Sequence, residues 1–172
     1  MKGMIYVFTG DGKGKTSAAL GVAVRAVSAG MKVAIIQWYK EKSWPISEHK
    51  LPKILKGIKI YPMGKGFYQL PTDHASPSQH KQSAQDALKK AESLMTKVDV
   101  LVLDEVNNAI NDKLITSSNL LNLISKREKT HLVLTGREAS KSIIDVADLV
   151  TEMKKIKHPF DQGKKAVKGL DF

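Results

Sequence analysis

A glycine-rich stretch near the start of the chain has the composition of a phosphate-binding loop. It reads Thr9-Gly10-Asp11-Gly12-Lys13-Gly14-Lys15-Thr16 and is called the P-loop (residues 9–16) below. Its glycines let backbone N–H groups close around an anion. We expect the Lys15 ammonium to reach phosphate oxygens and the Thr16 hydroxyl to ligate Mg²⁺. The candidate nucleotide-binding residues are Gly10, Asp11, Gly12, Lys13, Gly14, Lys15, Thr16 and Ser17.

The P-loop departs from the common pattern at one position. That pattern has a glycine five residues before the Gly-Lys pair. Here this position is Thr9, so the first glycine is displaced to Gly10. The flanking segments support phosphate binding, because residues 4–8 form an apolar run typical of a buried strand and residues 17–29 repeat apolar side chains at helical spacing. The alternative is a glycine turn beside basic residues, and the altered loop leaves open which phosphate group it holds.

Two further polar signals follow apolar runs. Asp104 and Glu105 come directly after residues 98–103, and a carboxylate at such a strand end can hold Mg²⁺ across from Thr16. Arg137 follows the run at residues 131–135, where its guanidinium is placed to stabilise charge on phosphate oxygens. An ordinary surface ion pair is the alternative for Arg137. The candidate metal ligands are therefore Thr16, Asp104 and Glu105.

Strand and helix patterns alternate along the chain. The expected strands are residues 4–8, 32–37, 58–61, 98–103, 131–135 and 149–153. The expected helices are residues 17–29, 77–97, 117–127 and 139–147. Unbroken apolar strands that alternate with helices indicate a mostly parallel sheet with helices on both faces. We therefore expect an α/β fold of three layers with about five to six strands, in a single domain over residues 1–172.

Polar loops follow most of the expected strands. They are residues 10–16, 37–40, 63–67, 104–105 and 136–137. In an open parallel sheet the carboxyl ends of the strands form the ligand crevice, so we expect these five loops to converge on one site. Aromatic residues in the loops, Trp38, Trp44, Phe67 and Tyr68, either stack on a flat ligand or fold back onto the core.

Composition limits the class of protein. The chain of 172 residues has no cysteine, which excludes disulfides, thiolate metal sites and a cysteine nucleophile. No apolar run approaches a membrane span and no signal-peptide core is visible, so we expect a cytoplasmic protein without a membrane partner. The net charge of +11 is spread along the chain, and no RNA- or DNA-binding motif accompanies it, so we do not expect a nucleic-acid partner.

Several stretches together resemble the ATP:corrinoid adenosyltransferases of cobalamin biosynthesis and salvage. They are residues 7–16, Val102-Leu103-Asp104-Glu105, Leu134-Thr135-Gly136-Arg137, Lys157-His158-Pro159-Phe160-Asp161-Gln162-Gly163 and Lys168-Gly169-Leu170-Asp171-Phe172. The displaced glycine is itself part of that family's loop. The resemblance implies a RecA-like P-loop NTPase fold, a homodimer and an electron-donating flavoprotein as a partner.

The resemblance also implies a reaction. The Co(I) of a corrinoid attacks C5′ of ATP, and the whole triphosphate leaves, with Mg²⁺ among the groups that stabilise its charge. Residues 63–67 match the family's Met-x-x-Gly-Phe motif, so Phe67 is the candidate corrinoid contact. The candidate catalytic residues are Lys15, Arg137 and Phe67.

Two departures concern the corrinoid. Members of the family usually have a tryptophan two residues after the phenylalanine, where this chain has Gln69, and Tyr68 or Trp44 is the candidate replacement. Many members carry an N-terminal arm, whereas this sequence begins almost at its first strand. The alternative function is therefore a P-loop ATPase or nucleotide-dependent switch without corrinoid alkylation, acting either alone or in association with nucleic acid.

Overall fold

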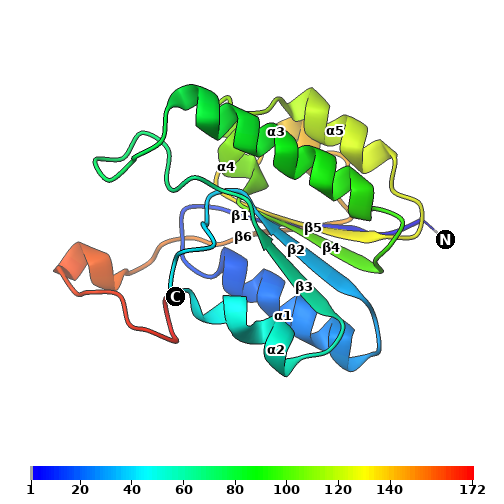
Figure 1. The fold of residues 1–172 in the computed structure, drawn as a ribbon, viewed down its shortest axis with the longest axis horizontal. Helices are drawn as coiled ribbons and strands as arrows, with labels where there is room; N and C mark the ends of the chain where they lie inside the picture. Colours follow the sequence, from blue (N-terminus) through cyan, green and yellow to red (C-terminus); the bar gives the residue numbers. More distant parts are fainter. Residues whose placement is uncertain (1) are drawn as a thin grey trace.

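The computed structural model describes residues 2–172 and shows an α/β fold (Figure 1). Its strands are β1 (Ile5–Thr9), β2 (Val33–Gln37), β3 (Ile58–Pro62), β4 (Val100–Asp104), β5 (His131–Thr135) and β6 (Leu149–Glu152). They form one six-stranded sheet in the order β3-β2-β4-β5-β1-β6, and every pair of neighbours is parallel. The predicted fold class is confirmed.

Helices join the strands. They are α1 (Lys15–Ser28), α2 (Leu51–Ile54), α3 (Pro77–Leu94), α4 (Val106–Asn111), α5 (Ser117–Ser125) and α6 (Lys141–Ile144), with 3₁₀ turns η1 (Ser47–Lys50) and η2 (Pro159–Gln162). The helix expected over residues 139–147 is reduced to the single turn of α6. The sequence did not predict α4, because three of its six residues are asparagines with low helix propensity. None of the helices within residues 2–172 is long and apolar enough to cross a membrane.

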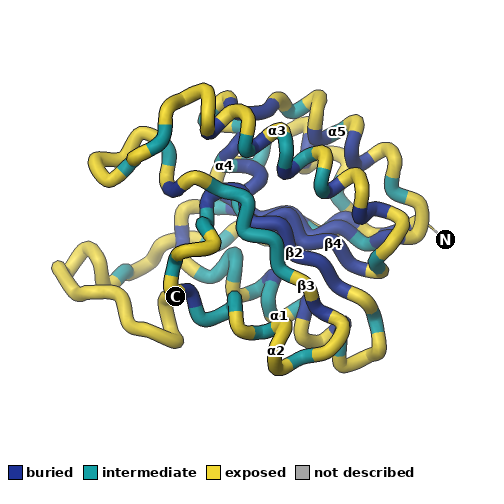
Figure 2. Tube along the Cα trace, in the orientation of Figure 1, coloured by how far each residue is buried: buried dark blue, intermediate teal, exposed yellow. Residues whose placement is uncertain are grey.

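The helices form a layer on each face of the sheet (Figure 1). Alternate residues of a strand point to opposite faces. In β4, Val100 and Val102 pack in the cluster that α1 covers, and Leu101 and Leu103 pack in the cluster under α3, α4, α5 and α6. Both layers bury the central strands β2, β4 and β5, as Figure 2 shows for the interior of the molecule. A buried sheet of this kind holds the ends of its strands rigidly in register.

Two helices of the layer that contains α3, α4, α5 and α6 begin with side-chain caps. Ser76 accepts a hydrogen bond from the Gln79 backbone while the Gln79 side chain accepts one from the Ser76 backbone, which completes a capping box at α3. Thr116 and Asn119 form the equivalent box at α5. These caps fix where α3 and α5 start and therefore where the loops at the carboxyl edge of the sheet end.

Candidate functional site

The P-loop joins β1 to α1 and lies against the end of β6. The Gly12 N–H donates to the Met153 carbonyl oxygen at 2.7 Å. A Cβ on Gly10 would lie only 2.4 Å from that same oxygen, and Gly10 has a φ of +99°. Thr9 is still part of β1, where a side chain is accommodated. The close approach to β6 therefore falls at residue 10, which explains why the first glycine of the loop is displaced by one position.

Lys15 points into the centre of the P-loop. Its ammonium donates to the carbonyl oxygens of Gly10 at 2.8 Å and Gly12 at 2.7 Å. Burial lowers the pKa of Lys15, and the nearby Arg137 guanidinium lowers it further, while Glu105 and Asp11 oppose this change. A partly buried ammonium beside a second cation is a favourable place for an anion such as phosphate.

Thr16 and Asp104 meet as the sequence predicts. The Thr16 hydroxyl donates to Asp104 Oδ1 at 2.9 Å, although the two residues are 88 positions apart. The Thr135 hydroxyl at the end of β5 donates to the same oxygen at 2.8 Å. Because β5 lies between β1 and β4, Thr135 bridges the gap between the P-loop and the acidic strand end.

Glu105 follows Asp104 directly, and one of its carboxylate oxygens has no hydrogen-bond partner. Its backbone has a φ of +63°, and its N–H donates to the Thr135 hydroxyl at 2.8 Å. Its Oε2 atom is buried and has no hydrogen-bond partner. An unsatisfied buried carboxylate oxygen is costly unless a ligand or a proton satisfies it.

These residues fit a magnesium ion that also binds phosphate. No group of three or more His, Cys, Asp or Glu residues that could hold a metal occurs within residues 2–172. Mg²⁺, however, is usually bound through one or two carboxylates together with water and substrate phosphates. The Thr16 hydroxyl, the Asp104 carboxylate and the orphan oxygen of Glu105 supply that partial set of donors.

We expect the Glu105→Gln variant to change how stability depends on pH in the absence of metal. Burial, and then the neighbouring Asp104 charge, raise the pKa of Glu105 from 4.5 to about 7. The folded state therefore binds more protons than the unfolded state between these values, and the free energy of unfolding falls as pH rises through this window. Glutamine removes this loss, so the variant should gain on the order of 2 kcal/mol over the wild type between pH 5 and pH 8.

Urea denaturation in EDTA at the two pH values measures this difference. Glu138→Gln makes the same substitution at an exposed carboxylate next to Arg137 and serves as the control. An equal stability difference for Glu105→Gln at pH 5 and pH 8 would contradict the prediction.

An ion-pair network that the sequence did not predict lies behind Asp104. The Lys40 ammonium is 2.8 Å from Glu48 Oε1 and 3.2 Å from Asp104 Oδ2, and its side chain is only 14% exposed. Burial alone would lower the pKa of Lys40, but Asp104 and Glu48 together raise it above its usual range. Lys40 lies shortly after the end of β2, and this position after a strand was the signal for Lys40 that the sequence contained. No comparable signal pointed to Glu48, which lies in η1.

Phe67 lies at the rim of the site within an aromatic group. Its ring stacks on Tyr39 at a centroid distance of 6.2 Å and tilts against Trp44 at 5.3 Å, and the residue is 42% exposed. Gly64 makes this arrangement possible, because a Cβ there would lie 2.1 Å from the Tyr39 backbone. The loop after β3 is thus pressed against the loop after β2.

The other loop aromatics lie in different surroundings. Trp38 is buried in the core. Tyr68 packs edge-on against His80 with a centroid distance of 5.1 Å and does not line the cavity that contains Phe67. Gln69 lies in the left-handed region with a φ of +58°. Of the two candidate replacements for the missing tryptophan, the structure brings Trp44 and not Tyr68 to Phe67.

One cavity of about 600 Å³ joins the P-loop to Phe67. The predicted site residues that line it are Lys13, Gly14, Lys15, Thr16, Ser17, Phe67, Glu105 and Arg137. Asp11 and Gly12 instead line a neighbouring cavity of about 420 Å³, on which Lys13, Lys15 and Arg137 also border. Arg137 is exposed and makes no ion pair with any residue from 2 to 172. Its guanidinium is therefore available at the boundary of the two cavities.

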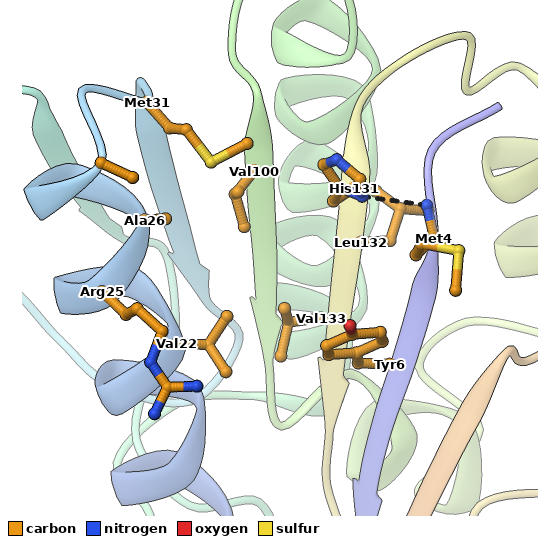
Figure 3. A pocket seen from close by; sticks show the side chains of 11 residues that line it. Met4, Tyr6, Val22, Arg25, Ala26, Met31, Val100, His131, Leu132 and Val133 are labelled. Carbon is orange, nitrogen blue, oxygen red and sulfur yellow. Dashed lines mark hydrogen bonds between the residues drawn. The ribbon is translucent and has the colours of Figure 1, made fainter. Parts of the chain in front are cut away.

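A third cavity lies at the opposite edge of the sheet (Figure 3). It has a volume of about 330 Å³ and lies between α1 and the first residues of the strands, with Met31, Val100 and His131 among its lining. Ala26 and Ala29 leave this space because their side chains are small. Its lining is mostly apolar and includes no residue of the P-loop, so it takes no part in phosphate binding.

Comparison with known proteins agrees with this geometry. The family model described as ATP:corrinoid adenosyltransferase BtuR/CobO/CobP matches residues 1–172. A corrinoid adenosyltransferase of Sinorhizobium sp is 37% identical over 177 residues, which cover 99% of this chain and 81% of that protein. Proteins of the same name from Pseudomonas aeruginosa and Escherichia coli K12 are 36% and 32% identical, again over 99% of this chain and over 84% and 86% of their own lengths.

Among solved structures, a DNA replication initiation factor overlaps 89% of this chain and 40% of its own, with a TM-score of 0.46 and 14% identity. The family model spans the P-loop, the acidic end of β4 and the segment after β6 alike. The chain therefore belongs to the ATP:corrinoid adenosyltransferase family.

Proposed function

We propose that this protein transfers the 5′-deoxyadenosyl group of ATP to the Co(I) of a corrinoid and releases triphosphate. One observation carries the proposal: a single cavity is lined both by the P-loop residues Lys15 and Thr16 and by Phe67. The phosphate-binding part of the site and the candidate corrinoid contact thus face the same space. Membership of the family supports the same activity.

The chemistry needs charge stabilisation and alignment. The Co(I) electron pair attacks C5′, a Co–C bond forms, and the C5′–O bond breaks with its electrons passing to the triphosphate. Lys15, Arg137 and the P-loop N–H groups are positioned to stabilise the negative charge that develops there. Bound Mg²⁺, held by Thr16, Asp104 and Glu105, would offset the same charge. No proton is transferred in this step, so the site needs no general base.

Phe67 has a separate task in this proposal. Its exposed ring, held against Tyr39 and Trp44, offers a flat apolar surface at the rim of the cavity. Such a surface can hold the corrin ring so that cobalt stays in line with C5′. Misalignment would slow the transfer without weakening the hold on ATP.

We expect Phe67→Ala to lower the rate of corrinoid alkylation about 100-fold, because a small displacement of the reacting atoms has an effect of this size. Its affinity for Mg·ATP should stay within twofold of the wild type, because the Phe67 ring packs on Tyr39 and Trp44 and carries no group that binds phosphate. Anaerobic incubation with ATP, Mg²⁺ and cob(I)alamin or cob(I)inamide gives the rate, followed through the light-sensitive Co–C product and released triphosphate. Calorimetry without corrinoid gives the affinity.

Leu70→Ala is the matched control, because Leu70 is an exposed apolar residue of the same loop that does not line the cavity. It should alkylate at the wild-type rate. Orthophosphate as the only product of the wild-type protein, with no alkylated corrinoid, would overturn the proposed function and would favour the ATPase or nucleotide-switch alternative.

The likeness to the family also supports finer parts of the proposal. These are the use of Mg²⁺, a homodimer, an electron-donating flavoprotein that reduces the corrinoid, a cytoplasmic place of action, and a single catalytic domain over residues 1–172. Sedimentation analysis tests the homodimer, and a comparison of Mg²⁺ with EDTA in the alkylation assay tests the metal.

A further inference from the structure

The end of the chain folds back to the cavity that joins the P-loop to Phe67, and Gly169, Leu170, Asp171 and Phe172 line it. After β6 the chain runs away from the sheet through η2, and residues 163–172, called the returning segment below, turn back toward the P-loop (Figure 1). The Asp171 carboxylate forms an ion pair with the Lys13 ammonium of the P-loop. The Ser47 hydroxyl of η1 donates to the Phe172 carbonyl oxygen at 2.9 Å. The returning segment thus bridges the loops that follow β1 and β2.

Hydrogen bonds within the returning segment hold its shape. The Val167 N–H donates to Asp171 Oδ2 at 2.6 Å, and the Gly169 N–H donates to the Phe172 carbonyl oxygen at 2.8 Å. The contact with Lys13, and then the Val167 N–H, lower the pKa of the Asp171 carboxyl. Asp171 is therefore ionised at neutral pH and suited to its place beside Lys13.

The returning segment supplies apolar side chains to the cavity. Four cations line the cavity, Lys13, Lys15, Lys40 and Arg137, together with the carboxylates of Glu48, Glu105 and Asp171. Apart from Phe67, five apolar side chains also line it: Leu20, Val24, Leu51, Leu170 and Phe172. A nucleoside triphosphate can use both kinds of side chain, because its phosphates are anionic and its base is flat and weakly polar.

Two of these apolar residues are unusually exposed to solvent. Leu170 is 76% exposed and Phe172 is 39% exposed, although both border the cavity. Apolar surface of this kind at the edge of a cavity gains free energy when a ligand covers it. Leu20 and Val24 belong to α1 and Leu51 begins α2, so the returning segment completes an apolar lining that the core helices begin.

We propose that the returning segment forms a wall of the nucleoside part of the ATP site, where Leu170 and Phe172 pack on the base and sugar. This inference rests on the proposed function, which places ATP in this cavity. Asp171 and Ser47 are positioning residues that hold the wall against the P-loop and η1. The segment thus favours a nucleoside triphosphate over free triphosphate, which lacks the group that the wall contacts.

Calorimetry with two ligands tests the wall. For Phe172→Ala and Leu170→Ala we expect the Kd of Mg·ATP to rise about 10-fold, the effect of losing one base-stacking or apolar contact, while the Kd of inorganic triphosphate with Mg²⁺ stays within twofold of wild type. Val167→Ala is the matched control, because Val167 is an exposed apolar residue of the same segment that does not line the cavity. It should leave both values unchanged.

The positioning residues give an independent readout. Asp171→Asn and Ser47→Ala should each raise the Kd of Mg·ATP about threefold, and combining either with Phe172→Ala should give less than the product of the single effects, because all three changes act on one wall. Thermal unfolding checks that every variant is folded, as expected for positions outside the core.

Unchanged ATP affinity in Phe172→Ala and Leu170→Ala would overturn the inference. An equal loss of affinity for ATP and for triphosphate would also overturn it, because the segment would then act on the phosphates. Failure of the proposed function is a separate result: wild-type protein would bind ATP but form no Co–C product. These assays contain no corrinoid, so the two outcomes are distinguished.

Discussion

Replacing Lys15 with alanine is expected to lower the affinity for Mg·ATP by about 100- to 1,000-fold. The Lys15 ammonium lies at the centre of the P-loop and donates to the Gly10 and Gly12 carbonyl oxygens. Bound phosphate would replace these neutral acceptors with charged ones. Each charge-assisted hydrogen bond contributes about 1.5–3 kcal/mol, and every 1.4 kcal/mol is about a factor of ten in Kd.

The rate of alkylation should fall further than the affinity. The leaving triphosphate carries more charge in the transition state than in bound ATP, so a cation at this position stabilises the transition state more than the ground state. We therefore expect kcat of Lys15→Ala to fall about another 100-fold at saturating ATP. Calorimetry gives the Kd and the anaerobic product assay gives kcat.

Lys56→Ala serves as the control for Lys15→Ala, because it removes an exposed lysine between α2 and β3 that lines none of the cavities around the P-loop. It should behave as wild type in both measurements. Wild-type affinity for ATP in Lys15→Ala would show that the P-loop does not hold the phosphates, and the proposed function would then lose its central assumption.

The order of the elements could be predicted from the sequence because the strands are fully buried. Val100 to Asp104 is buried at every position, so β4 appears in the sequence as an unbroken apolar run that ends in an acid. Short helices were harder to predict. The four-residue helix α2 was not among the expected helices, because a single turn is too short to show a periodic pattern. Its Pro52 lies in the first turn, where a missing N–H costs nothing.

The contact between the P-loop and the end of β4 could be predicted because it follows from strand ends. Thr16 and Asp104 are distant in the sequence, but both lie at the carboxyl edge of a parallel sheet, and that rule brought them together. Side chains that reach the site from irregular segments could not be placed in this way. Glu48 lies in a 3₁₀ turn and Asp171 in the returning segment, and neither has a periodic pattern that indicates its direction.

Tyr68 illustrates the same limit on the corrinoid side. It neighbours Phe67 in the sequence, which made it a candidate binding residue. In the loop after β3 the two rings diverge, because Phe67 turns to Trp44 and Tyr68 turns to His80. Two neighbouring residues in a loop need not point toward the same partner, whereas alternate residues in a strand point to the same face of the sheet. A contact between Tyr68 and the corrinoid stays a prediction.

Replacing Asp104 with asparagine is expected to remove the benefit of Mg²⁺ for ATP binding. Asp104 Oδ1 accepts hydrogen bonds from the Thr16 and Thr135 hydroxyls, and Oδ2 faces the Lys40 ammonium at 3.2 Å. An asparagine oxygen can keep the two hydroxyl contacts, but its NH₂ group then faces the Lys40 ammonium and cannot accept from it. The lost negative charge, however, weakens the hold on a divalent cation, because hard cations prefer carboxylate oxygens.

The stability of Asp104→Asn should fall by about 1–3 kcal/mol, because the Lys40 ammonium loses one of its two carboxylate acceptors. Lys40 keeps its ion pair with Glu48 at 2.8 Å, so the buried ammonium remains compensated. The Asp104 charge also raises the pKa of Glu105, after burial, and removing that charge relieves this repulsion. These two effects distinguish the variant from a simple loss of a buried ion pair, which costs about 3–5 kcal/mol.

Calorimetry with ATP in Mg²⁺ and in EDTA measures the effect of Asp104→Asn directly. Wild-type protein should bind ATP about 100-fold more tightly with Mg²⁺, since the metal links the protein to the phosphates, whereas the variant should show nearly equal affinities in the two buffers. Asp86→Asn is the control, because Asp86 is a half-exposed carboxylate on α3 that lines neither cavity beside the P-loop, and it should keep the full difference. A variant that retains the wild-type difference would show that Asp104 acts on Thr16 and Lys40 alone, and that the metal is held by other groups.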